Sequence, residues 1–313
     1  MSSADTDLFL SYREPPVLSI QHPAFENAGI SVSVLREDLN HPFVSGNKWW
    51  KLRDNIKEAK RSGKPVLTFG GAFSNHIFAT AAACNELKIP CTGIIRGEAG
   101  PVESSTIRFA KSCGMEIIRV TRGQYRKKED SDFFDLLPFP SSGFYIIPEG
   151  GTNNTAVRSC MNWGQKIAEK FRDDFDCILL PAGTGGTAAG LIAGINGDLF
   201  VHVFSVLKSG DFLQNNIARM LEDLFSLIGG FNKNLSAHWK LHTNYHFGGY
   251  GKRNDRVLNF MKLLSTQSPL DAVYTAKMFL GIADLADLGA FNRGSRLLAI
   301  HTGGLQGNSG FLI

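Results

Sequence analysis

The stretch Ser45-Gly46-Asn47-Lys48-Trp49-Trp50-Lys51-Leu52 joins an irregular, acidic segment to a segment with a helical pattern. Apolar residues at Leu52, Ile56 and Ala59 recur on one helix face, which predicts a helix that begins near Lys48. The positive end of the helix dipole disfavours a cation there, and this field together with burial would lower the pKa of the amine. An amine with a lowered pKa can attack an aldehyde. Local spacing alone favours a solvated lysine over a nucleophile, and the rest of the chain reverses this preference.

Composition limits the class of protein. The chain has 313 residues, 43% hydrophobic and 20% charged, as in a soluble globular protein. The net charge of +4 is too small to indicate nucleic-acid binding. No apolar run approaches the roughly 20 residues of a membrane-spanning helix, and the first residues show no signal pattern. Five cysteines without disulfide or metal-binding spacing predict a cytoplasmic protein with no metal site.

Strand patterns alternate with helical patterns along most of the chain. Strands are expected at 30–35, 65–69, 88–95, 115–120, 144–147, 176–181, 199–206 and 296–301. Helices are expected at about 48–62, 75–87, 106–113, 156–171, 188–195, 213–227, 255–264 and 275–288. This alternation predicts an α/β fold with a parallel, doubly wound sheet. Residues 1–16 indicate an arm, and most of 207–250 shows no clear pattern.

Four of the expected strands end in a polar or glycine-rich turn. These turns lie near residues 70, 148, 182 and 302. Ligands of open α/β sheets bind outside the carboxyl ends of the strands. The sequence therefore predicts that the four turns meet at a single site.

The turn Gly183-Thr184-Gly185-Gly186-Thr187 has the composition of a phosphate site. Its glycines let backbone amides surround an anion, and the helix that follows presents its positive end. A P-loop would need a Lys-Ser/Thr pair after the glycines, which is missing. A dinucleotide site would need an acidic residue after the next strand, but 204–208 contains no carboxylate. The pattern favours a mononucleotide-sized phosphate.

A second turn, Gly70 to His76, also leads into a helix. Its free amides suit a substrate carboxylate. Ser74 or Asn75 can also simply cap the helix, and both roles are compatible. Asn75 could in addition donate to a phenolate oxygen of a cofactor.

No other polar residue indicates a catalytic role when it is considered alone. Tyr250 and Tyr274 are two of only six tyrosines, and each would more often be a core or surface residue than a catalytic one. His76 and His301 are likewise more often satisfied structural groups. No hydrolase triad order and no zinc-binding helix motif is present.

Together these segments resemble a known family. The motifs, in order, are Gly46-Asn47-Lys48 with Lys51-Leu52, Gly70-Gly71 with Ser74-Asn75-His76, the 183–187 turn, Val273-Tyr274-Thr275 with Lys277, and His301-Thr302-Gly303-Gly304. The chain resembles the pyridoxal-phosphate enzymes of the 1-aminocyclopropane-1-carboxylate deaminase and D-cysteine desulfhydrase family. The resemblance covers nearly the whole chain and is weakest in 1–16 and 207–245.

The resemblance implies a set of cofactor contacts. Lys48 would carry the Schiff base with pyridoxal phosphate, and Lys51 would be a second lysine nearby. Asn75 would bond the phenolic oxygen of the cofactor. The 183–187 turn would bind its phosphate, and Thr302 would face the pyridine nitrogen.

The resemblance also implies the substrate contacts. Ser74 and the amides of Asn75 and His76 would hold the carboxylate of a small amino acid, and Ser74 could relay a proton. Tyr250 and Tyr274 would flank the ring and the substrate as catalytic residues.

The implied fold has two open, twisted, mostly parallel sheets, as in the tryptophan synthase β subunit. Residues 52–155 would form a smaller domain, inserted into a larger one made of 1–51 and 156–313. Relatives of this kind suggest a homodimer.

Two positions bear on the substrate. The deaminase pattern has Glu and Leu where this chain has Thr275 and Thr302, which is closer to the desulfhydrase pattern. A threonine near the ring nitrogen gives a weaker electron sink, which still suffices for β-elimination. Ala276, where glycine is expected, and the poorly matching 207–245 region depart from the pattern. The expected activity is therefore D-cysteine β-elimination, with the cyclopropane deaminase as the alternative. A non-catalytic cofactor or metabolite binder is the alternative from another class.

Overall fold

A computed structural model describes residues 12–230 and 235–311 of the chain. Six described strands form the larger sheet, in the order β1-β2-β10-β7-β8-β9. Their bounds are Val17–Ile20 (β1), Ser31–Leu35 (β2), Cys177–Ala182 (β7), Phe200–Ser205 (β8), Trp239–His242 (β9) and Arg296–Ile300 (β10). All neighbouring pairs are parallel except β1 and β2. The last strand of the chain, β10, lies between β2 and β7, so it joins the first and second halves of the chain.

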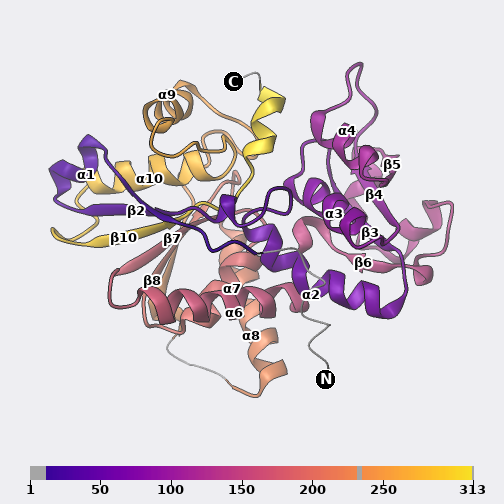
Figure 1. Cartoon of the computed structure of the whole chain (residues 1–313), viewed down its shortest axis with the longest axis horizontal. Helices are drawn as coiled ribbons and strands as arrows, with labels where there is room; N and C mark the ends of the chain where they lie inside the picture. The colour runs from indigo at the N-terminus through magenta and orange to yellow at the C-terminus, as the bar shows by residue number, and fades with distance from the viewer. Residues whose placement is uncertain (1–11, 231–234, 312–313) are drawn as a thin grey trace.

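The second sheet contains four described strands in the order β5-β4-β3-β6, all parallel. Their bounds are Val66–Gly71 (β3), Cys91–Arg96 (β4), Glu116–Val120 (β5) and Tyr145–Ile147 (β6). The two sheets lie at opposite ends of the molecule in Figure 1. Two mostly parallel sheets are the fold class that the sequence predicted, and this prediction is confirmed.

Helices connect and cover the strands. The α-helices are Pro23–Ala28 (α1), Asn47–Ser62 (α2), Asn75–Glu86 (α3), Ser105–Ser112 (α4), Arg122–Arg126 (α5), Asn154–Phe171 (α6), Gly186–Ile195 (α7), Phe212–Ile228 (α8), Asp255–Leu264 (α9) and Thr275–Asp287 (α10). Short 3-10 helices are Glu37–Leu39 (η2), Ser131–Leu136 (η3), Ser141–Gly143 (η4), Glu149–Gly151 (η5), Leu235–His238 (η6) and Leu305–Phe311 (η7). Helix α2 runs between the two sheets (Figure 1).

The larger sheet is covered on both faces. Helices α1, α9 and α10 pack together in one apolar cluster, and α6, α7 and α8 belong to another on the opposite face (Figure 1). Every residue of α7 is buried. Glycine at position 194 lets α6 and α7 approach closely, because a Cβ there would lie 2.0 Å from the carbonyl oxygen of Met161. This packing fixes the N-terminus of α7 at the end of β7.

The division into domains stays a prediction. The strands of the smaller sheet lie within the predicted 52–155 insertion, and those of the larger sheet lie in 1–51 and 156–313. Helix α2, however, crosses the predicted boundary at residue 52. The sequence analysis did not predict β1, α1 or β9. The predicted arm at 1–16 lies mostly outside the described residues.

Candidate active site

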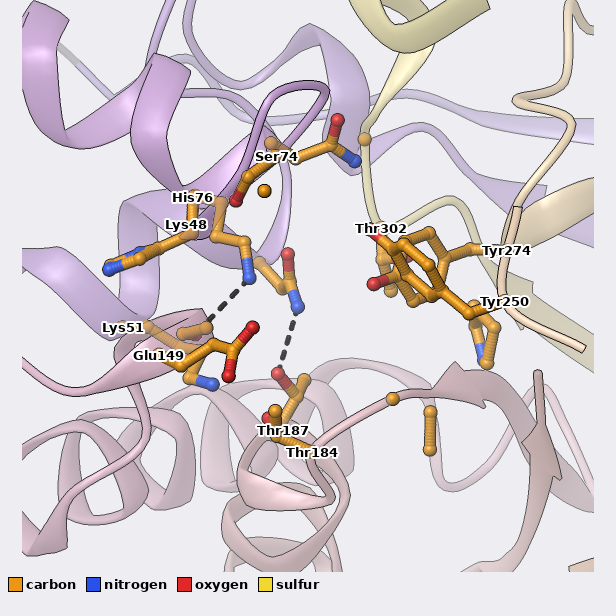
Figure 2. A pocket seen from close by; sticks show the side chains of 18 of the residues that line it. Lys48, Lys51, Ser74, His76, Glu149, Thr184, Thr187, Tyr250, Tyr274 and Thr302 are labelled. Carbon is orange, nitrogen blue, oxygen red and sulfur yellow. Dashed lines mark hydrogen bonds between the residues drawn. The ribbon is translucent and has the colours of Figure 1, made fainter. Parts of the chain in front are cut away.

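The turns that follow β3, β6, β7 and β10 line one cavity of about 380 Å³. This is the convergence of strand ends that the sequence predicted. Figure 2 shows the two lysines on one side of the cavity, the two tyrosines and Thr302 on the other, and the threonines of the glycine turn below. Of the predicted site residues, all line the cavity except Gly186.

The first turn of α2 is held by a close backbone contact. Gly46 has φ +66°, and a Cβ at this residue would lie 2.1 Å from the carbonyl oxygen of Thr302. The backbone N–H of Asn47 donates to the same oxygen at 3.2 Å. Only glycine fits this position, which explains why it precedes Asn47 and Lys48. The contact ties the start of α2 to the end of β10.

A buried carboxylate supports the same turn. Glu37 is 1% exposed and accepts hydrogen bonds from Tyr12 Oη at 3.1 Å, Asn40 Nδ2 at 2.7 Å and Trp50 Nε1 at 3.4 Å. Its backbone oxygen and the side chain of Asn40 both bond to Gly46. Burial raises the pKa of Glu37 to about 7, and the hydrogen bonds oppose this shift. No lysine or arginine is recorded against this carboxylate among the described residues.

Replacing Glu37 with glutamine is expected to change how stability depends on pH. The raised pKa means that Glu37 favours the folded state most below about pH 4.5 and that this contribution is lost as the pH rises through about 7. The loss amounts to about 3 kcal/mol at most. A glutamine can accept from Asn40 and Trp50 and donate to the Tyr12 hydroxyl. Urea midpoints between pH 5 and 8 should therefore fall less for E37Q than for the wild type, and parallel curves would contradict this.

Lys48 and Lys51 lie one helical turn apart on the cavity side of α2. The Nζ of Lys48 donates to the carbonyl oxygen of Gly150 at 3.3 Å, and that of Lys51 donates to Thr152 Oγ1 at 2.7 Å. Burial lowers the pKa of Lys48 to about 8. Burial and the charge of Lys48 lower the pKa of Lys51 well below its usual value. The cavity thus contains two amines, each of which is readily available in its neutral, nucleophilic form.

The glycine turn before α7 is a candidate anion site. Gly185, the N-cap, has φ +85° and no side-chain acceptor for the first amides of the helix. These free N–H groups and the positive helix end suit a phosphate. Thr187 accepts from Asn47 Nδ2 at 2.9 Å, and Thr184 pairs with Thr152 at 2.6 Å. Gly186 lies behind the cavity, where a Cβ would meet the Thr152 side chain at 2.6 Å.

The N-terminus of α3 is a second candidate anion site. Ser74 is the N-cap, and its Oγ accepts from the amide of Ile77 at 3.3 Å. The first amides of this helix have no intrahelical acceptor. The ring of His76 turns away from Lys48 (Figure 2) and lies 2.7 Å from Thr68 Oγ1, so the His76 backbone rather than its ring is available to a ligand. Burial and the two lysine charges lower the pKa of this ring well below its usual value, so it is neutral.

The side-chain amide of Asn75 is oriented by the last described helix. Gln306 of η7 donates to Asn75 Oδ1 at 3.1 Å. The Nδ2 group therefore faces Gly304, where a Cβ would lie only 2.5 Å away. Asn75 lines the cavity, and this Nδ2 group is its side-chain donor.

Two tyrosines cover the opposite wall. The rings of Tyr250 and Tyr274 meet edge to face with centroids 6.0 Å apart. Tyr274 is the N-cap of α10, and its backbone amide donates to Asp271 Oδ1 at 2.7 Å. Burial, followed by the nearby Tyr250, raises the pKa of Tyr274 well above its usual value, so its hydroxyl stays protonated. A Cβ at Gly183 would touch this hydroxyl at 3.3 Å, so the tyrosine lies beside the anion site.

The two threonines that bear on the substrate are placed differently. Thr302 lines the cavity. Thr275 is fully buried, and its hydroxyl donates to Asp271 Oδ2 at 2.6 Å, so it is not part of the cavity lining. The hydroxyl of Thr275 therefore does not reach the cavity, because it is held by the carboxylate of Asp271.

Some lining residues were not predicted. Arg96 is the last residue of β4 and Glu149 lies two residues after β6, so the rule of strand ends could have found them. Thr152 and Gln306 act on the site through Thr184 and Asn75, and no sequence pattern indicated them.

These residues fit a cofactor that has an aldehyde, an aromatic ring and a phosphate. The free amides at α7 would hold the phosphate, and the buried amine of Lys48 would meet the aldehyde. The cavity between them is lined by Tyr274 and Thr302, which leaves space for a flat ring. Asn75 presents a donor for a phenolic oxygen.

No helix in the described part of the chain has both the length and the apolar character to cross a membrane.

Residues 8–303 match a family described as "Pyridoxal-phosphate dependent enzyme". A putative 1-aminocyclopropane-1-carboxylate deaminase of Pyrococcus furiosus is 30% identical over 298 residues, which cover 89% of this chain and 86% of that protein.

A plant relative has a double name. The bifunctional D-cysteine desulfhydrase/1-aminocyclopropane-1-carboxylate deaminase, mitochondrial, of Arabidopsis thaliana is 29% identical over 321 residues, covering 95% of this chain and 78% of that protein. A crystal structure described as an ACC deaminase homologue superposes with a TM-score of 0.79 at 27% identity and covers 98% of this chain and 97% of that one. The family match spans more than half of the chain, and the cavity has the groups that the cofactor needs. The chain therefore belongs to the family of pyridoxal-phosphate-dependent enzymes.

Proposed function

We propose that this enzyme catalyses β-elimination from D-cysteine, with water as co-reactant and pyruvate, ammonia and sulfide as products. The observation that carries the proposal is Thr302, whose hydroxyl lies on the cavity wall beside the tyrosines at the position where the deaminase pattern has leucine. A hydroxyl near the ring nitrogen supports a weaker electron sink, which suffices when an α-proton is removed and a thiol leaves. The name of the Arabidopsis relative includes D-cysteine desulfhydrase beside the deaminase, so it agrees with this choice without separating it from the second candidate below.

The bound cofactor supplies an aldehyde and an electron-withdrawing ring. The residues of the chain supply the rest. The amides at the start of α3, with Ser74, hold the substrate carboxylate. Lys48 removes the α-proton at its Nζ, and its pKa of about 8 lets the neutral amine be present near neutral pH. Tyr274, which stays protonated, is placed to donate a proton to the leaving thiolate.

A second candidate is the 1-aminocyclopropane-1-carboxylate deaminase reaction. It is favoured by the names of the Pyrococcus furiosus relative and of the superposed structure. This substrate has no α-proton, so Tyr274 or Ser74 would assist ring opening. This chain has Thr275 where the deaminase pattern has glutamate, so that position gives no carboxylate for the stronger electron sink that this reaction needs.

A substrate panel separates the two reactions. The purified holoenzyme is incubated with D-cysteine, L-cysteine and 1-aminocyclopropane-1-carboxylate, and sulfide and keto acid are measured. We expect sulfide and pyruvate from D-cysteine. Release of 2-oxobutanoate from the cyclopropane substrate, without sulfide from D-cysteine, would instead support the deaminase.

We further propose that the enzyme is a homodimer located in the cytoplasm. Light scattering of the purified protein tests the dimer, and cell fractionation tests the location.

Replacing Thr302 with glutamate is expected to shift the visible absorption of the holoenzyme. A carboxylate beside the ring nitrogen would favour the protonated ring, whereas the hydroxyl does not. The spectrum is compared with that of Thr275→Ser, since Thr275 is held by Asp271 away from the cavity. An unchanged T302E spectrum would place Thr302 away from the nitrogen.

A further inference from the structure

A buried lysine outside the cavity has no role in the reaction described above. Lys277 is 0% exposed and belongs to the first turn of α10. Its Nζ donates to the carbonyl oxygens of His246 at 2.9 Å and Gly249 at 2.7 Å. Burial lowers the pKa of Lys277 to about 8, and the charge of Asp271 opposes this. Burying an amine costs free energy unless the amine is hydrogen-bonded. The two carbonyl oxygens offset this cost for Lys277.

The carbonyls belong to a segment with an unusual backbone. Phe247, Gly248, Gly249 and Gly251 all have positive φ, at 47°, 97°, 113° and 68°. Phe247 is the informative one, because a bulky residue rarely adopts this conformation. Hydrogen bonds within the segment run from Gly249 N to His246 O, from Lys252 N to Gly249 O and from Gly248 N to His246 Nδ1. The two bonds from Lys277 join this segment to α10.

The same segment carries Tyr250 to the cavity. Tyr250 lines the cavity yet remains 46% exposed, so its ring lies at the mouth. Tyr274, at the N-cap of α10, lies about one helical turn before Lys277. The helix thus holds one tyrosine directly and the other through the lysine, and their rings meet at 6.0 Å.

We propose that Lys277 is a positioning residue that holds Tyr250 over the mouth of the cavity through the His246 and Gly249 carbonyls. Lys277 itself does not line the cavity and acts only through the segment. The inference rests on the proposed function in one respect, that Tyr250 meets the substrate.

A double-mutant cycle tests the link to Tyr250. Lys277→Met removes the donors while keeping a similar shape, and each carbonyl keeps its backbone partner within the segment. We expect K277M and Y250F each to lower kcat/KM by roughly 10-fold, and the double variant to lie within about 3-fold of Y250F alone. Multiplying effects would overturn the proposal, because a purely structural lysine would act independently of the Tyr250 hydroxyl. The cycle uses whichever amino acid the enzyme turns over.

Limited trypsin digestion gives a measurement that needs no substrate. Lys252 is exposed directly after the segment, so its cleavage reports how firmly the segment is held. We expect trypsin to cut the K277M holoenzyme after Lys252 at least about 5-fold faster than the wild type. The reason is that the segment opens locally more often when the two hydrogen bonds from Lys277 are lost. Lys262→Met, at an exposed lysine of α9, is the matched control and should be cut like the wild type.

Equal cleavage rates in K277M and wild type would refute the positioning role even if the proposed reaction is correct. Faster cleavage in K277M would support it even if D-cysteine proves not to be the substrate. Should K277M fail to fold, Lys277→Gln retains one donor group and is expected to give an intermediate cleavage rate. A Gln variant that is cut like the wild type would count against the role of the second bond.

Discussion

Lys48→Met holoenzyme is expected to lose at least about 10³-fold in kcat and to lack the absorption band of a cofactor bound covalently to the protein. Lys48 is the amine proposed both to attach the cofactor and to remove the α-proton, so its loss affects binding and chemistry together. The loss in kcat corresponds to about 4 kcal/mol in the activation free energy. Absorbance spectra and turnover of the substrate panel measure the two effects separately.

The matched control is Lys51→Met, one turn further along the same helix. Lys51 donates to Thr152, which pairs with Thr184 of the anion site. We therefore expect K51M to keep the colour but to bind the cofactor more weakly. Borohydride reduction followed by peptide mapping should label Lys48 in the wild type. Label on Lys51, or a coloured and active K48M, would show that the roles of the two lysines are reversed.

The turns of the site could be predicted from the sequence better than the edge strands of the larger sheet. Turns at the ends of buried parallel strands have glycines and polar residues that interrupt long apolar runs, so positions such as 70–76 and 183–187 stand out. By contrast, β1 is exposed at three of its four residues, and β9 has only four residues, so neither shows a strong period. Edge strands of this kind depend on pairing with β2 and β8 rather than on their own pattern.

Other features could not be predicted because they depend on contacts between distant residues. Thr275 was named only as a position that bears on the substrate, and the sequence did not show that its hydroxyl donates to Asp271 four residues earlier. Lys277 was noted only as part of a motif, and its partners lie 31 and 28 residues away. The burial of Glu37 without a cation follows from the packing of Trp50 and Tyr12 around it. A single sequence gives residue types and spacing, whereas these assignments need the positions of atoms.

Replacing Gly46 with alanine should be among the most destabilising single substitutions in this chain. The new Cβ would lie 2.1 Å from the carbonyl oxygen and 2.4 Å from the carbonyl carbon of Thr302. No side chain can move to relieve this contact, since both atoms are backbone atoms at the end of β10. Adding the cost of φ +66° for alanine, we expect a loss of at least about 4 kcal/mol in the free energy of unfolding.

The matched control lies at the other end of the same helix. Gly63 has φ +67°, nearly the value of Gly46, but a Cβ there has no atom within 4 Å. Gly63→Ala should therefore cost only about 1 kcal/mol, which is the penalty for the left-handed backbone alone. Urea midpoints of the two holoenzymes, at equal cofactor concentration, isolate the contact with Thr302. Equal losses would mean that the start of α2 can move away from β10, and Lys48 would then not be held by this contact.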